Sequence, residues 1–211
     1  MILFELVGGN EADPAYKALE VENGSRQYDF IRSIVSASVA VQRPMLSSVV
    51  IKALNFHAIT CLHTNAGEYR PCPVVVGSHN PPEHYRVEAL MDDMINVVNW
   101  HWNKTDSVAL ATYVLWRLNW IHPFINGNGR TARAASYFVL CMKSGGWLRG
   151  KTILPELIRR ERAAYVAALQ EADAEAAKNN PNFLTALHKL LSDLLKEQLE
   201  SDPEPEPKPS A

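Results

Sequence analysis

The segment of residues 122–133, HPFINGNGRTAR, constrains this chain more than any other, because it interrupts two stretches of helical periodicity. Apolar residues recur at helical spacing on both sides of it. They are Val108, Ala111, Leu115, Leu118 and Ile121 before the segment, and Ala132, Ala135, Val139 and Met142 after it. Pro123 disfavours a helical conformation at His122, and Gly145 and Gly146 are typical of a helix C-cap. The segment is therefore predicted to be a loop between two helices.

The composition of this loop suits a phosphate site. Gly127 and Gly129 allow positive φ angles and close approach of a ligand, while free amides at the start of the second helix face an anion. Arg130 and Arg133 lie three residues apart, so both can reach phosphate oxygens from one side of the helix. His122 can act as a base near neutral pH. Together they predict transfer from a nucleotide to a hydroxyl, although a histidine near glycines can also be an ordinary loop residue.

The same residues resemble the signature of the Fic family, HxFx(D/E)GNGRxxR. The matching positions are His122, Phe124, Gly127, Asn128, Gly129, Arg130 and Arg133. Residues 67–77 (GEYRPCPVVVG), followed by Pro81 and Pro82, are similar to the β-hairpin flap of Fic proteins. Residues 161–173 (ERAAYVAALQEAD) are similar to their adenine-pocket helix. The resemblance extends over residues 47–195, most of the chain.

This resemblance implies a protein adenylyltransferase that moves AMP from ATP to a Ser, Thr or Tyr hydroxyl of a target protein, with magnesium. His122 and Arg130 would be catalytic, the first taking the hydroxyl proton and the second holding charge that develops at the α phosphate. The nucleotide-binding residues implied are Phe124 as the buried anchor of the loop, Gly127, Asn128, Gly129 and Arg130 around the α and β phosphates, Arg133 at the γ phosphate, and Tyr165 and Asp173 at the adenine. Arg70 and Val75 on the flap would dock the target by β-augmentation.

Asn126 departs from the family pattern, which has Asp or Glu at this position to bind magnesium. An amide offers a neutral carbonyl oxygen, whereas magnesium prefers carboxylates. We therefore expect a weakened magnesium site at Asn126. The alternative is that Asn126 only shapes the loop, which would leave a nucleotide-binding regulatory module without turnover.

A second motif resembles the family's autoinhibitory sequence, (S/T)xxxE(G/N). Residues 18–23 read ALEVEN, with Ala18 in place of the usual hydroxyl. The resemblance implies that Glu22 pairs with Arg133 and blocks the γ phosphate, and that the same glutamate can support removal of AMP. The alternative is an exposed glutamate on a solvated helix.

The expected fold is mainly α, a helical bundle with one small β-hairpin flap. Asp13 and Pro14 predict the start of a helix that stops at Asn23 and Gly24, and Ser25 then caps another. Val74 to Val76 give the one strong strand signal. Further helices are expected near residues 47–61, 88–99, 155–177 and 181–199. We expect an N-terminal helical extension at 1–46 with the inhibitory helix at 14–23, a catalytic core at 47–199, and a disordered tail at 200–211.

Composition sets broad limits. The 211 residues have a formal net charge of −2, so no general attraction to nucleic acid or to a membrane is expected. Cys61, Cys72 and Cys141 are odd in number and far apart, which indicates reduced thiols in a cytoplasmic protein. ATP and a target protein are the expected partners, and a homodimer is left open. A Doc-like phosphotransferase or other nucleotide transferase is the nearest alternative, although the Doc branch resembles ANKR where this chain has GNGR.

Overall fold

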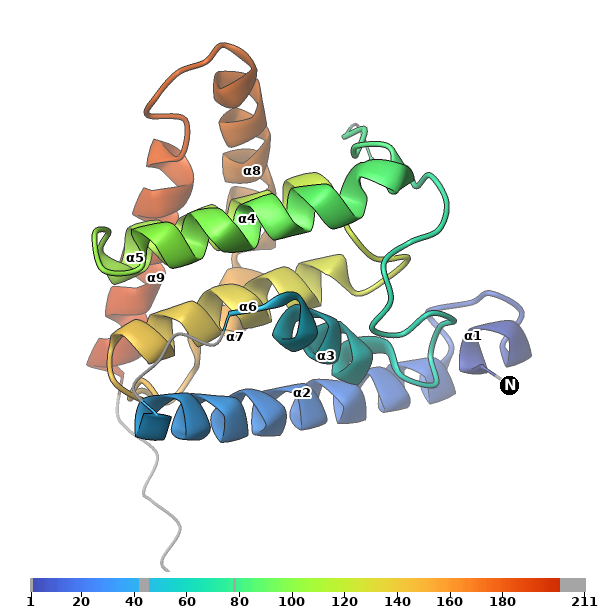
Figure 1. The fold of residues 1–211 in the computed structure, drawn as a ribbon. Coiled ribbons are helices and arrows are strands. Elements are labelled where there is room, and N and C mark those ends of the chain that lie inside the picture. The colour runs from blue at the N-terminus through green and yellow to red at the C-terminus, as the bar shows by residue number, and fades with distance from the viewer. Residues whose placement is uncertain (1, 42–45, 78, 202–211) are drawn as a thin grey trace, which may run out of the picture. The chain divides into compact units, whose positions relative to one another are not determined.

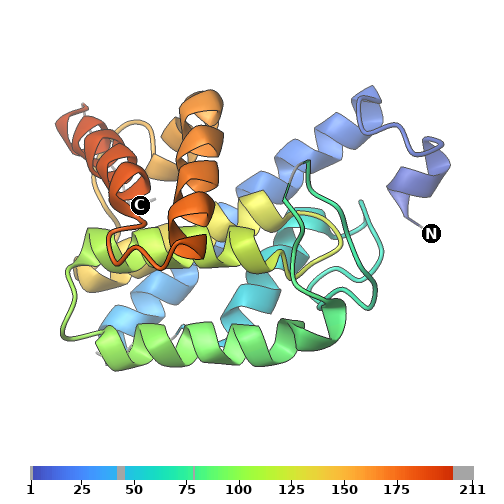
Figure 2. The ribbon, with the colours of Figure 1, turned by 90° about the horizontal axis from the view of Figure 1, so that it is seen from above.

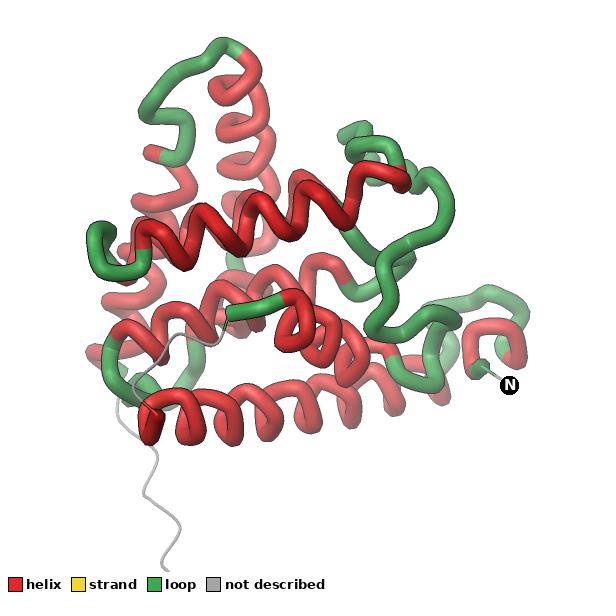
Figure 3. Tube along the Cα trace, viewed as in Figure 1, coloured by secondary structure: helices red, strands yellow, loops and turns green. Residues whose placement is uncertain are grey.

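A computed structural model describes residues 2–41, 46–77 and 79–201 of the protein. This part of the chain is mainly helical, and Figure 3 shows its helices joined by loops. By contacts the chain divides into two compact units, residues 1–146 and 147–211. This division falls inside the region that the sequence predicts to be one core.

The first unit is built around α6. Its elements are α1 (Leu3–Leu6), α2 (Pro14–Val41), α3 (Ser48–Ile59), the 3-10 helix η1 (His84–Arg86), α4 (Val87–His101), α5 (Ser107–Ile121) and α6 (Asn128–Lys143). Helices α2, α3 and α5 pack against α6, which is buried along most of its length (Figure 1). Ser136 on α6 donates a hydrogen bond to Ala111 O of α5 at 2.9 Å. Seen from above in Figure 2, α4 lies beside α5.

The helices that hold the signature segment begin and end close to their predicted limits. Ser47 caps α3 by accepting from Val50 N, and Asp106 caps α5 by accepting from Ala109 N at 2.8 Å. Helix α5 ends at Ile121 and α6 begins at Asn128. The predicted helix–loop–helix is therefore confirmed, with the loop confined to residues 122–127.

The predicted break at Asn23 and Gly24 is wrong, because α2 continues without interruption from Pro14 to Val41. Asn23 is fully buried, and its amide donates to Thr60 O at 2.9 Å rather than capping a helix. One turn later Gln27 donates to Leu54 O at 2.7 Å. These two bonds, to α3 and to its C-cap residue, stabilise the helical conformation at Gly24. A glycine inside a helix otherwise costs about 1 kcal/mol of stability relative to alanine. The predicted short inhibitory helix at 14–23 is thus the first part of a longer one.

The predicted strand at Val74 to Val76 does not form, and the β-hairpin flap is not confirmed. The described part of residues 67–82 is loop with one isolated antiparallel bridge, between Val76 and His79. Val75 is 81% exposed. A two-stranded hairpin is marginal without a third strand or a packing surface, and prolines in this segment remove backbone donors.

The described residues of the second unit, 147–201, form three helices that pack against one another, α7 (Leu154–Arg160), α8 (Arg162–Ala177) and α9 (Thr185–Glu200). The single helix predicted over residues 155–177 is divided at Glu161, which leaves the helical region at φ −89° and ψ 35°. Gln198 is fully buried and holds the loop before α7, since its Oε1 accepts from Leu154 N at 2.6 Å and its Nε2 donates to Arg149 O at 3.1 Å. The predicted tail beyond residue 201 lies outside the described residues.

Candidate active site

The loop between α5 and α6 requires two left-handed residues. His122 caps α5 at φ 51° and ψ 58°, and Gly127 is the N-cap of α6 at φ 76°. A Cβ at Gly127 would lie 2.6 Å from Ile59 Cγ2. Gly129 has no positive φ, and a Cβ there would lie 3.4 Å from the flexible end of Arg133. The positive φ and the lack of room for a Cβ therefore require glycine at position 127, and neither requires it at position 129.

Phe124 and Asn128 shape the loop from inside. Asn128 accepts from Phe124 N at 2.9 Å and donates to Phe124 O at 2.8 Å, which closes the turn. Phe124 is fully buried and packs against Tyr69 with the rings tilted by 44° and their centroids 5.6 Å apart. The structure confirms Phe124 as a buried anchor. Asn128 is 4% exposed and its amide is taken up by Phe124, so its predicted place around the phosphates stays a prediction that concerns its backbone.

His122 is a partly buried neutral imidazole at neutral pH. Burial lowers its pKa to about 4, a hydrogen bond with the backbone of Asn119 opposes this, and the positive charges of His79 and Arg70 lower the pKa further. Its backbone N–H donates to Leu118 O at 3.0 Å. A neutral imidazole is the form that accepts a proton, so His122 is chemically able to act as the predicted base.

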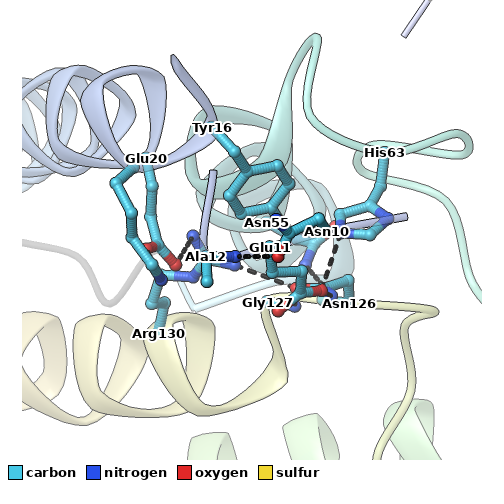
Figure 4. A network of polar contacts seen from close by, with 11 residues as sticks. Asn10, Glu11, Ala12, Tyr16, Glu20, Asn55, His63, Asn126, Gly127 and Arg130 are labelled. Carbon is cyan, nitrogen blue, oxygen red and sulfur yellow. Dashed lines mark hydrogen bonds and ion pairs between the residues drawn. The ribbon is translucent and has the colours of Figure 1, made fainter. Parts of the chain in front are cut away.

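Arg130 is held between the loop and α2 (Figure 4). Its Nη2 donates to Asn126 Oδ1 at 2.9 Å, and its Nη1 lies 3.1 Å from Glu20 Oε1. The contact with Glu20 is an ion pair without the alignment of a hydrogen bond. Glu20 also pairs with Lys17 at 2.8 Å. A carboxylate of α2 therefore meets Arg130 as an anionic ligand would.

The segment before α2 reaches the loop at Asn126. Asn126 Nδ2 donates to Glu11 Oε1 at 3.1 Å, and the same Glu11 oxygen lies 3.3 Å from His63 Nε2. His63 Nε2 is in turn 2.7 Å from Tyr16 Oη (Figure 4). Burial is the main cause that raises the pKa of Tyr16 to about 12 and lowers that of His63. No sequence pattern pointed to Glu11, Tyr16 or His63 as neighbours of the loop.

Asn55 of α3 supports the loop from the other side. It is fully buried, and its Nδ2 donates to Asn126 O at 2.9 Å and to Thr131 Oγ1 at 3.2 Å. Its Oδ1 accepts from Gly67 N at 3.0 Å. One signal was available in the sequence, because Asn55 is an amide directly after the apolar Leu54 in a helix whose predicted buried face is otherwise apolar.

The arrangement around Asn126 does not fit magnesium at that residue. Asn126 Oδ1 already accepts from Gly127 N at 2.6 Å and from Arg130 Nη2. A divalent cation on this oxygen would lie beside a guanidinium that points at the same atom, and magnesium favours charged oxygen ligands. Within the described ranges, no cluster of three or more His, Cys, Asp or Glu side chains has the geometry of a metal site.

The expected pairing of Glu22 with Arg133 is absent. Glu22 is exposed, whereas Glu20 faces the loop. Two residues along an α-helix rotate the side chain by about 200°, so when Glu20 faces Arg130, Glu22 faces away. Arg133 forms no hydrogen bond or ion pair with residues 2–41, 46–77 or 79–201. It remains a candidate ligand for an anion.

Arg70 and Val75 have different environments. Arg70 is 2% exposed and cannot contact a target protein with its side chain, which corrects its predicted docking role. The physical reason is that carbonyl groups of His122, Cys72 and Pro82 surround its guanidinium. Val75 is 81% exposed, and its docking role stays a prediction.

Tyr165 and Asp173 both lie on α8 in the second unit. Tyr165 is buried at 5% exposure, and Asp173 is half-buried. Their predicted roles at the adenine stay predictions. No helix in the described part of the chain has the length and apolarity needed to cross a membrane.

Comparison with known proteins finds a family whose model matches the part of the chain that contains the loop. Residues 46–140 match the model of the Fic/DOC family. The chain is 29% identical over 161 residues to the protein adenylyltransferase Fic of Drosophila persimilis, a match that covers 74% of this chain and 30% of the relative. The protein of the same name from Drosophila grimshawi is also 29% identical, with 32% of its length covered. The chain thus spans about a third of the length of these curated relatives.

Solved structures share the fold. A Fic domain-containing signalling protein from Bacteroides thetaiotaomicron aligns with a TM-score of 0.63 and 21% identity, covering 88% of this chain and 76% of that one. Fic-1 from C. elegans aligns with a TM-score of 0.63 and 23% identity, covering 85% of this chain and 48% of that one.

Proposed function

The chain carries a Fic/DOC-family domain over residues 46–140, and on this premise we propose that it is a protein adenylyltransferase. The observation that carries the proposal is the placement of two groups on the loop of residues 122–127. A neutral His122 stands at the end of α5, and the Arg130 guanidinium belongs to the first turn of α6. A base beside a cationic helix N-terminus suits attack of a hydroxyl on a polyphosphate.

The proposed reaction is an in-line displacement at the α phosphorus of ATP. The target hydroxyl oxygen forms a bond to this phosphorus, and its proton passes to the imidazole of His122. The bond from the α phosphorus to the bridging oxygen breaks, and pyrophosphate leaves. Backbone amides of the first turn of α6 and the guanidinium of Arg130 hold the charge that develops. Arg133, which is without a protein partner among the described residues, would hold the γ phosphate.

Regulation is part of the proposal, with Glu20 in the place first expected for Glu22. Glu20 lies 3.1 Å from Arg130 Nη1, so a phosphate group and this carboxylate compete for one guanidinium. Glu20 is 29% exposed at its side chain, so water screens the pair only in part. Release of α2 from Arg130 is then a step of nucleotide binding.

A nucleotide-binding module without turnover is a second candidate. It is favoured by Asn126, whose side chain is engaged by Glu11, Gly127 and Arg130 and offers no anionic oxygen. In such a protein the loop would bind ATP, but the α phosphate would stay with the nucleotide.

Incubation with ATP labelled at the α or the γ phosphate separates these candidates. We expect α label on the protein itself or on proteins of a lysate, and none in His122→Ala, which should still bind ATP in calorimetry. Transfer of γ label instead would indicate a Doc-like phosphotransferase. ATP binding without either transfer would support the regulatory module.

A further inference from the structure

Arg70 is a buried cation whose hydrogen-bond acceptors are backbone carbonyls. Its Nε donates to His122 O at 2.8 Å, its Nη1 to Cys72 O at 3.1 Å, and its Nη2 to Pro82 O. Burial lowers the pKa of this guanidinium. An aliphatic side chain would fill the same space without the cost of desolvating a charge. What arginine adds here is a rigid set of directed donors.

These bonds connect the segment that contains Arg70 to the loop that contains His122, the candidate base. Besides the side-chain bond to His122 O, the backbone N–H of Arg70 donates to Pro123 O at 2.8 Å. His122 is in the left-handed region, which is unfavourable for a residue with a Cβ. The peptide that follows His122 is therefore held in a disfavoured orientation by donors from Arg70. The direction of the imidazole depends on that backbone.

We propose that Arg70 is a positioning residue, which holds His122 in its left-handed conformation and ties the backbone at Cys72 and Pro82 to the same loop. The role of His122 as a base rests on the proposed adenylyltransferase function. The effect of Arg70 on the environment of His122 does not, and it can be measured in the absence of any reaction.

Two substitutions separate the charge of Arg70 from its geometry. Arg70→Lys keeps the charge, but one ammonium cannot reach three carbonyls that a planar fork spans. Arg70→Gln removes both. If the directed bonds matter, both variants loosen the loop and expose the imidazole of His122. If only the charge matters, Arg70→Lys behaves like the wild type.

The first readout is the NMR titration of the imidazole of His122 in ¹⁵N-histidine-labelled protein. We expect its pKa to rise toward the ordinary value by about one unit or more in both variants, because the ring becomes more hydrated. The second readout is transfer of label from α-labelled ATP to the protein itself. We expect the rate to fall about 10- to 100-fold, while the calorimetric affinity for ATP changes less than about threefold.

Gln27→Met is the matched control. Gln27 is also buried and also donates to a backbone carbonyl, Leu54 O at 2.7 Å, but it does not contact the loop. It should lower stability and leave the titration of His122 and the transfer rate unchanged. Folded Arg70→Lys and Arg70→Gln proteins with wild-type titration and rate would overturn the proposal. If the wild type transfers no label, the proposed function fails, and the titration still decides the role of Arg70.

Discussion

Gly127→Ala is expected to destabilise the protein by about 2–5 kcal/mol, for two separable reasons. Gly127 has φ 76°, and a left-handed conformation costs alanine about 1–2 kcal/mol. Its new Cβ would lie 2.6 Å from Ile59 Cγ2 and 3.1 Å from Asn55 Nδ2. Both neighbours are fully buried, so they cannot move aside freely. Such overpacking typically costs about 1–3 kcal/mol more.

Gly145→Ala isolates the conformational part. Gly145 has φ 81°, but no atom lies within 4 Å of a Cβ placed there. It should therefore cost only about 1–2 kcal/mol. Gly129 lies in a helix and has no positive φ, and a Cβ there would meet only the flexible end of Arg133 at 3.4 Å. Gly129→Ala should therefore be close to neutral for stability.

Urea unfolding of the three variants, with ATP affinity measured by calorimetry, tests this reasoning. The difference between Gly127→Ala and Gly145→Ala is the cost of the contact with α3. Because the loop must shift to relieve that contact, Gly127→Ala should also weaken ATP binding, whereas Gly145→Ala should not. Equal destabilisation by both variants would show that the contact with Ile59 does not require glycine.

Three further changes address the polar network. Glu20→Ala should raise the affinity for ATP several-fold and increase self-modification with α-labelled ATP, since the ion pair that it removes is worth about 1 kcal/mol. Equal gains in Glu22→Ala would refute the choice of Glu20. Asn126→Asp places one carboxylate oxygen about 3 Å from Glu11 Oε1 and leaves the other beside the Arg130 guanidinium. Because Glu11→Gln removes only the repulsion, we expect it to raise the urea midpoint of Asn126→Asp, and we expect magnesium to raise that midpoint as well. The free energy of unfolding should fall as the pH drops from about 6.5 to about 4, because His122 has a pKa of about 4 in the folded protein and binds its proton more readily when unfolded. The loss is at most about 1.4 kcal/mol per pH unit. It should be smaller in His122→Gln.

Local rules were sufficient to predict the helices around the loop from the sequence. Apolar periodicity and the proline after His122 act over a few residues, and each had the predicted effect. Positive φ angles were expected at both Gly127 and Gly129, and the structure has one at Gly127 only, at the start of α6. The resemblance added chemistry to these positions without changing where they lie.

The errors have a common cause in tertiary contacts. Whether Glu20 or Glu22 faces the loop depends on the rotation of α2 about its axis, which is set by the packing of α2 against α3 and α6 and by the bond from Asn23 to Thr60 O. A two-residue change along a helix reverses the direction of a side chain. Sequence spacing predicts how the side chains of one helix point relative to one another. Which of them faces the loop is decided by the packing of α2 against α3 and α6.

Arg70 illustrates the same limit for a charged residue. Exposure is the default expectation for arginine, and the acceptors that bury it come from His122 and Pro82, which are 52 and 12 residues away in sequence. Backbone carbonyls carry no sequence signature, so no composition rule could identify them as partners. The predicted role in target docking came from the resemblance to the family's flap, and a side chain that is 2% exposed gives that role no support.

The loop signature combines residues with two physical roles, and they should respond differently to substitution. Phe124, Gly127 and Asn128 determine the shape of the backbone through burial, a positive φ and a closed pair of amide bonds. His122 and Arg130 offer an imidazole and a guanidinium to a ligand. Changes in the first group should alter stability and ligand binding together, because the positions of His122 and Arg130 depend on that backbone. Changes in the second group should alter the chemistry with little loss of stability, and this includes Arg130, because Glu20 keeps its ion pair with Lys17 when Arg130 is removed.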